Sequence, residues 1–217
     1  MTTTTIPGEL FLLLTDDAGR QEATSSRKEA VAAAAVAELM LRERVQLSEE
    51  KQPRVQVTDT SSTGIPVIDQ ALGALTELAP GRLRSVISHR WMDLTEVTGE
   101  GLVAAGALRR KDGWFTTTWP AHDDTLETGL RARLGAAVAD PSKASLQDAI
   151  LLELLRALGI AHRILKDDIA GMSRRDLDRA IQGLAVDHPA ARAVKRAMDD
   201  MTAVMIATTA ATTTVIT

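Results

Sequence analysis

Apolar side chains recur along most of the chain at the three-to-four-residue spacing of amphipathic helices. The most apolar such segment is 146–158, which Ser145 and Asp148 are placed to cap and Gly159 is placed to end. The segment from Ala30 to Ala37 contains only Ala and Val, which predicts a core helix in close contact with its neighbours. Taken along the chain, the pattern predicts a mainly α-helical single domain, resembling a helical bundle, of about eight or nine helices.

A different pattern follows Gly106, which is placed to end a predicted helix that starts near Leu94. The segment up to Trp119 is predicted to form a projecting β-hairpin, in which successive side chains point to opposite faces. Asp112-Gly113 predicts a type I′ turn, which needs φ > 0 at both central positions. With that turn, one face of the hairpin carries Leu108, Arg110, Phe115, Thr117 and Trp119, and Arg110 faces Phe115. The other face carries Arg109, Lys111, Trp114, Thr116 and Thr118.

This hairpin is the main candidate for a binding surface, because it holds three of the chain's five aromatic residues. Trp suits the interfacial zone of a bilayer, and nearby cations attract anionic lipid. The predicted membrane or partner contacts are Arg109, Arg110, Lys111, Trp114 and Phe115. In one alternative, the aromatic side chains pack inward and the cations only keep an edge strand soluble. In another, the hairpin mediates self-association.

Composition and net charge argue against several classes of function. The 217 residues carry a net charge of −4, which argues against a general electrostatic grip on nucleic acid. A winged-helix interpretation is also disfavoured, because the helix before the hairpin carries Glu96 and Glu100 and no basic residue. The chain has no Cys, which is typical of a cytoplasmic protein. No signal peptide or membrane-spanning segment is visible, so we expect any membrane contact to be peripheral, on the inner face.

A second candidate site is a basic cluster that could bind an anion, formed by Arg82, Arg84, Arg90 and Trp91. The alternative for this cluster is a solvated helix face. His122-Asp123-Asp124 could contribute to a metal site, but a helix cap explains it better. No phosphate-binding loop, nucleophile elbow or catalytic carboxylate pair is present, so we expect neither enzymatic activity nor a cofactor or metal.

Four segments, in the same order, resemble motifs of one known family. They are Glu9–Leu14 with Asp16 and Gly19, then Glu38–Leu47, then Thr63–Leu72, and finally Leu102–Leu108. These segments are similar to the Golgi phosphoprotein 3 family, in its bacterial branch, over about residues 8 to 205. The composition, without Cys or Tyr and rich in Ala and Arg, is also typical of a bacterial protein.

The resemblance implies a mostly helical fold with a projecting hydrophobic hairpin. Eukaryotic members bind phosphatidylinositol 4-phosphate on Golgi membranes and gather glycosyltransferases there. The resemblance therefore implies a peripheral membrane adaptor, with a phosphoinositide or another anionic lipid as its partner. A Trp and three Arg-like residues hold the headgroup in the family. The corresponding positions here are Ala23, Ala32, Met92 and Thr95, and none of them matches.

The pattern also predicts how the chain is divided. Residues 1–7 are expected to be a disordered N-terminus and residues 8–207 to form the helical domain. Residues 208–217 are rich in Thr, a poor helix former, and are expected to fray.

Overall fold

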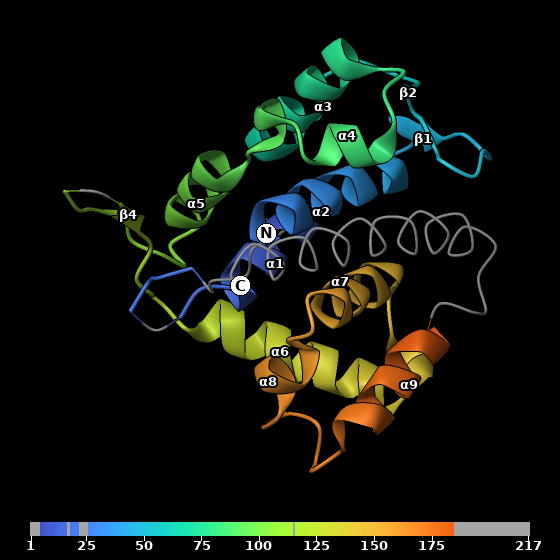
Figure 1. The fold of residues 1–217 in the computed structure, drawn as a ribbon. Helices are drawn as coiled ribbons and strands as arrows, with labels where there is room; N and C mark the ends of the chain where they lie inside the picture. The colour runs from blue at the N-terminus through green and yellow to red at the C-terminus, as the bar shows by residue number, and fades with distance from the viewer. Residues whose placement is uncertain (1–4, 17, 22–25, 115, 185–217) are drawn as a thin grey trace, which may run out of the picture.

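The computed structural model of the protein describes residues 5–16, 18–21, 26–114 and 116–184 (Figure 1). Within these ranges the chain forms nine α-helices, two short 3-10 helices and two two-stranded antiparallel sheets, which confirms the mainly helical fold with a projecting hairpin. In chain order the elements are α1 (Ile6–Leu13), α2 (Arg27–Leu41), β1 (Val45–Leu47), β2 (Val55–Val57), α3 (Pro66–Leu78), α4 (Leu83–Ile87), η1 (Arg90–Met92), α5 (Thr95–Ala104), β3 (Lys111–Asp112), β4 (Thr117–Thr118), α6 (Thr125–Ala139), η2 (Pro141–Lys143), α7 (Leu146–Ala157), α8 (Ala161–Leu165) and α9 (Arg174–Leu184).

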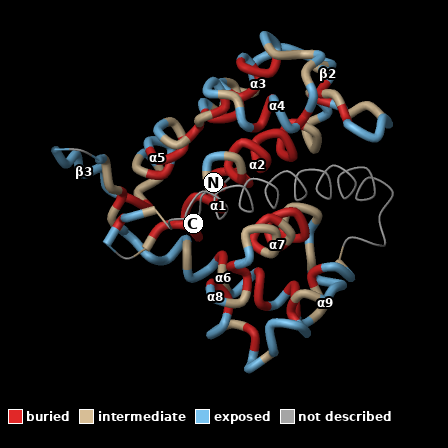
Figure 2. Tube along the Cα trace, viewed as in Figure 1, coloured by how far each residue is buried: buried red, intermediate tan, exposed pale blue. Residues whose placement is uncertain are grey.

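Helix α1 lies at the centre, between α2–α5 on one side and α6–α9 on the other (Figure 1). It contacts α2, α5, α6 and α7, and every one of its residues is buried (Figure 2). It begins at Ile6, and the Thr5 hydroxyl caps it by accepting a hydrogen bond from the Gly8 amide at 3.2 Å. Residues 5–7 are therefore part of the folded domain, which corrects the predicted disordered segment 1–7. Residues 1–4 and 208–217 lie outside the described residues.

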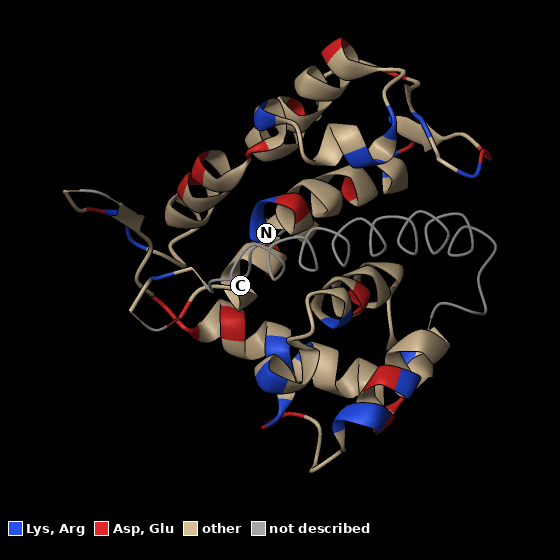
Figure 3. Ribbon diagram, viewed as in Figure 1, with Lys and Arg blue, Asp and Glu red and all other residues tan. Residues whose placement is uncertain are grey.

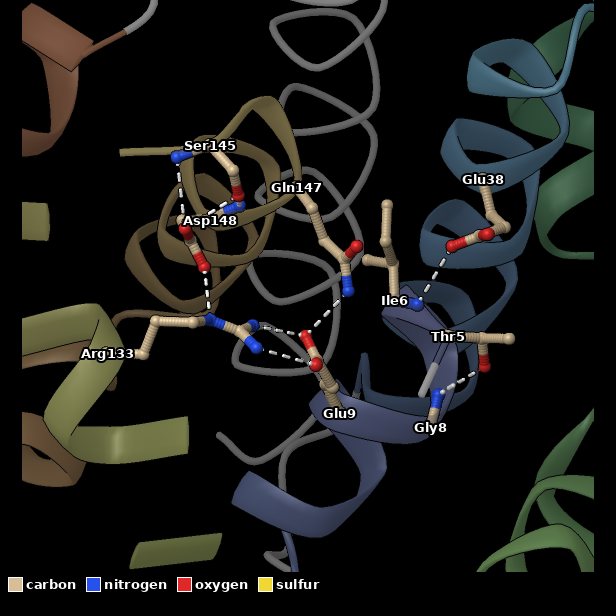
Figure 4. Close-up of polar contacts among 9 residues, drawn as sticks. All are labelled: Thr5, Ile6, Gly8, Glu9, Glu38, Arg133, Ser145, Gln147 and Asp148. Carbon is tan, nitrogen blue, oxygen red and sulfur yellow. Dashed lines mark hydrogen bonds and ion pairs between the residues drawn. The ribbon is translucent and has the colours of Figure 1, made fainter. Parts of the chain in front are cut away.

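Helix α2 packs against α1 through the predicted Ala and Val stretch. Residues Ala30 to Ala37 are at most 1% exposed, which confirms the core helix. Glu38, on the last turns of α2, also caps α1, because its Oε2 accepts the Ile6 amide at 3.0 Å (Figure 4). Its Oε1 accepts a hydrogen bond from Arg42 Nε at 2.8 Å. A buried carboxylate next to a helix N-terminus is favourable because it meets unpaired amides and the positive end of the helix dipole.

An ionic network with two buried carboxylates joins α1 to α6 and α7 (Figure 4). The Glu9 carboxylate, with a side chain 3% exposed, accepts two hydrogen bonds from Arg133, at 3.1 and 2.7 Å. Arg133 Nε donates to Asp148 at 2.7 Å, and Gln147 Nε2 donates to Glu9 at 2.9 Å. Asp148 also completes the predicted capping box with Ser145. Burial lowers the pKa of Arg133, but the bonds and charges of Glu9 and Asp148 outweigh burial and raise this pKa above its ordinary value.

Asp69 organises the loop before α3. Its carboxylate accepts hydrogen bonds from the Thr63 amide at 2.6 Å, the Thr63 hydroxyl at 2.7 Å and the Gly64 amide at 3.1 Å, as well as from the Ser62 hydroxyl at 2.5 Å. Burial raises the pKa of Asp69, but these hydrogen bonds lower it by more, so its pKa lies below the ordinary value. The ionised form of Asp69 thus holds the segment that leads into α3.

We predict that Arg133→Met lowers the free energy of unfolding by about 2–4 kcal/mol, because two buried carboxylates lose their shared cation. The expected loss of free energy is moderate because the Arg133 side chain is 43% exposed, so solvent partly screens its charge. Urea unfolding measures the change. Arg175→Met, which alters an exposed Arg of α9, should change the free energy by less than about 0.5 kcal/mol. Equal effects of the two substitutions would contradict the role of Arg133.

We predict that Asp69→Asn destabilises the protein at neutral pH by about 1 kcal/mol and has little effect in acid. A carboxylate with a depressed folded pKa stabilises fully above its unfolded pKa, about 4, and this contribution is lost as pH falls through the folded value. Urea unfolding of both chains between pH 7 and pH 2 tests this. A difference between the chains that does not change with pH would refute the assignment.

Candidate functional site

The hairpin projects from one end of the molecule, beside α5 (Figure 1). Its strands pair Lys111 with Thr118 and Asp112 with Thr117, and the Gly113 amide donates to the Thr116 carbonyl at 3.0 Å. The predicted type I′ turn at Asp112-Gly113 is therefore wrong, and the turn lies two residues further along, with Trp114 in it. The reason is local: the Asp112 side chain accepts hydrogen bonds from Arg110 and Thr117, which keeps Asp112 within the strand.

The shift of two residues changes the pairing but preserves the two faces, because side chains alternate with a period of two. The predicted pairing of Arg110 with Phe115 involves a residue that lies outside the described part of the chain. Arg110 lies over Trp119, with its guanidinium carbon 5.6 Å from the ring centroid. Leu108 and Trp119 are each 2% exposed, so the predicted inward face does close on a core.

Trp119 fixes the base of the hairpin to the domain. Its ring meets Phe11 edge-to-face, with centroids 6.1 Å apart, and its amide donates to the Gly19 carbonyl at 2.7 Å. The ring lies so close to Gly99 on α5 that a Cβ there would be 2.6 Å from it. The cluster around Trp119 is separate from the main core and comprises Phe11, Leu12, Leu102, Ala107, Leu108 and Trp119.

Arg110 forms a second link between the hairpin and α5. It makes ion pairs with Glu96, Glu100 and Asp112, the last two at 2.9 Å. Figure 3 shows acidic residues on α5, the helix that lies beside the hairpin. The hydrogen bonds that Arg110 donates, first to Glu96 and then to Asp112, raise the pKa of Arg110 above its ordinary value. Arg110 thus tethers the hairpin base in the free protein, and it does not stand at the tip among the cations predicted to meet phosphate.

The tip presents the predicted aromatic and basic groups to solvent. Trp114 is 92% exposed, far more than Trp91 at 45% or Leu126 at 38%, the other large exposed apolar side chains in the described part of the chain. Lys111 is exposed on β3. Arg109 is exposed nearer the base, with its Nη2 2.9 Å from His122 Nδ1. The tip therefore combines one extended aromatic surface with a nearby cation.

The second predicted cluster is divided. Two elements carry it: Arg82 and Arg84 lie at the start of α4, whereas Arg90 and Trp91 lie in η1. Trp91 packs edge-to-face on His89, with centroids 4.9 Å apart. Arg82 lies instead opposite Arg54, through a backbone bridge that sequence analysis missed. The pairing joins residues 28 positions apart in the sequence, so no local sequence pattern predicts it.

Two further predictions concern ligands. Among the described residues, no group of acidic or His side chains is arranged to hold a metal ion. Asp123 caps α6, where its carboxylate accepts the Thr125 amide at 2.8 Å; hydrogen bonds from Thr125 lower the pKa of Asp123. Of the positions that correspond to family headgroup residues, Ala32 and Met92 are buried, Thr95 is half-buried and Ala23 lies outside the described residues. None of these side chains carries a charge that would hold a phosphate.

We predict that Trp119→Ala lowers the free energy of unfolding by about 3–5 kcal/mol, because it empties a filled core position. Trp114→Ala truncates a Trp side chain that is exposed to solvent, and should change the free energy of unfolding by less than about 0.5 kcal/mol. Thermal and urea unfolding of the two variants provide the comparison. A large loss of stability in Trp114→Ala would show that the tip is packed rather than exposed.

Comparisons with known proteins support the fold. The family model described as Golgi phosphoprotein 3 (GPP34) matches residues 6–201. A search of curated proteins found no match. In the described part of the chain, no helix has the length and apolar character needed to cross a membrane.

Proposed function

The chain belongs to the Golgi phosphoprotein 3 family, and on that basis we propose that it is a non-enzymatic adaptor that binds anionic membranes peripherally through its hairpin. The observation that carries the proposal is Trp114, which is 92% exposed at the end of a projecting hairpin. An apolar ring of this size in water is unfavourable, and large exposed apolar groups commonly mark interaction sites. An amphipathic indole is suited to the headgroup region of a bilayer.

Local charge directs the tip toward anionic rather than neutral lipid. The net charge of the whole chain is −4, so attraction must come from Lys111 and Arg109 rather than from the protein as a whole. Each cation near an anionic surface contributes about 1 kcal/mol of attraction, which weakens as salt rises. The acidic residues at the hairpin base are partly neutralised by Arg110.

Anchoring of the hairpin favours docking because it lowers the entropy lost on binding. Trp119 is buried between α1 and α5, and Arg110 joins the hairpin to α5, so the base of the hairpin is held by two separate contacts. A surface that is already ordered loses less conformational freedom when it meets its partner. We expect a preference for anionic lipid in general, since the family headgroup positions lack charged residues here.

Liposome co-sedimentation tests the proposal. The native chain should pellet with vesicles that contain anionic lipid and remain in solution with neutral vesicles. Trp114→Ala should weaken binding at least about tenfold, which is the effect of losing roughly 1.5–3 kcal/mol of apolar burial. Lys111→Ala should weaken it about three- to fivefold at low salt.

Trp91→Ala is the matched control, because it removes a partly exposed Trp from a site outside the hairpin. It should leave pelleting within about twofold of the native value. No pelleting with any lipid would refute the membrane proposal. A Trp114-dependent, concentration-dependent increase in mass by sedimentation velocity would then assign the hairpin to self-association.

A further inference from the structure

A pair of arginines lies side by side on a small polar face at the other end of the molecule. The Val55 amide donates to the Gly81 carbonyl and the Leu83 amide donates to the Pro53 carbonyl, both at 2.9 Å. These two bonds flank Arg54 and Arg82, which are partners in an antiparallel bridge. This is the pairing without direct hydrogen bonds, in which the two Cα atoms approach to about 4.5 Å and the side chains are closest. Arg54 and Arg82 therefore leave the backbone close together, on one face.

The like charges of this pair are only partly compensated. Arg54 Nη1 donates to the Pro80 carbonyl at 3.0 Å, and its Nε lies 3.7 Å from Glu50 Oε2. The Arg82 guanidinium makes no hydrogen bond or ion pair within the described residues. Like charges directly opposite one another on paired strands destabilise the fold. A bound anion would therefore reduce the repulsion between Arg54 and Arg82.

The surroundings leave the pair accessible. Val45, Val55 and Leu83 are at most 2% exposed, so the opposite face of this small sheet is turned to the core. On the outer face, Arg82 is exposed and the Arg54 side chain is 42% exposed. Lys51 and Arg84, close by in sequence, are exposed and add positive charge, and Glu49 and Glu50 oppose it. Figure 3 shows basic residues on α4 and near β2 at this end of the molecule.

We propose that Arg54 and Arg82 form a binding site for the phosphate group of a soluble phosphorylated molecule. A tetrahedral dianion can accept hydrogen bonds from two guanidinium groups at once and neutralise both charges, whereas chloride cannot bridge them in this way. The site is independent of the proposed hairpin function. In Figure 1 the hairpin and the β1–β2 sheet lie at opposite ends of the molecule, so a membrane that holds the hairpin tip is remote from the arginine pair.

Thermal unfolding in phosphate and in chloride at matched ionic strength tests the site, with inorganic phosphate and then pyrophosphate as probes. The Tm of the native chain should rise with phosphate concentration and saturate, because a ligand that binds only the folded state stabilises it. In chloride, the Tm of Arg82→Gln should be about 1–3 °C higher than that of the native chain, because the repulsion between the two arginines is removed. The Tm of this variant should not rise with phosphate concentration. Arg54→Gln should also lose the rise.

Arg175→Gln is the matched control, because it removes one exposed positive charge on α9. It should keep the native response to phosphate. Equal Tm values in phosphate and chloride for the native chain would overturn the proposal, as would an undiminished phosphate response in Arg82→Gln.

Vesicles containing phosphatidic acid distinguish a lipid phosphate from a soluble one. With Trp114→Ala, which lacks the hairpin contact, no pelleting that depends on Arg82 is expected. Pelleting of Trp114→Ala that disappears with Arg82→Gln would overturn the assignment to a soluble ligand. The phosphate response of Trp114→Ala should equal that of the native chain, so this site and the hairpin proposal can fail separately.

Discussion

The fold depends on the burial of one short helix whose polar groups are satisfied by its neighbours. Helix α1 has no exposed face, so its carboxylate and its first amides must find partners inside the protein. Arg133 meets Glu9 from α6, and Glu38 meets the Ile6 amide from α2. These contacts link the helices on both sides of α1 through directional bonds. Apolar packing alone would tolerate more than one orientation of the helix.

The segments that resemble the Golgi phosphoprotein 3 family have a structural explanation. Glu9 holds Arg133, Glu38 caps α1, and Asp69 organises the loop before α3. Gly19 has φ of +76° and lies against the backbone of Pro120, where a Cβ would be 2.1 Å from the Pro120 nitrogen. The first three of the four segments therefore maintain the fold, and the first of them also contacts the chain at the base of the hairpin. The residues that this chain shares with the family therefore account for the fold, whereas the positions that correspond to the family's headgroup residues carry no charged side chain.

Local patterns predicted the helices well and the binding surfaces only in part. Ala30 to Ala37, the Ser145 capping box and the inward turn of Leu108 and Trp119 follow from periodicity and capping chemistry, which act over a few residues. The hairpin turn was misplaced because the side-chain bonds of Asp112 outweigh the turn preference of Asp112-Gly113. The roles of Arg110 and Arg54 were missed, because both depend on partners brought near by the tertiary fold.

The central functional claim is that the Trp114 ring enters the membrane interface while the rest of the domain stays outside it. Tryptophan fluorescence in a Trp91→Phe chain tests this directly, since only Trp114 and the buried Trp119 then remain. With anionic vesicles that carry brominated acyl chains, we predict a blue shift and strong quenching of the Trp114 signal. Unchanged emission at vesicle concentrations that saturate binding, or unchanged emission because no binding occurs, would contradict the account.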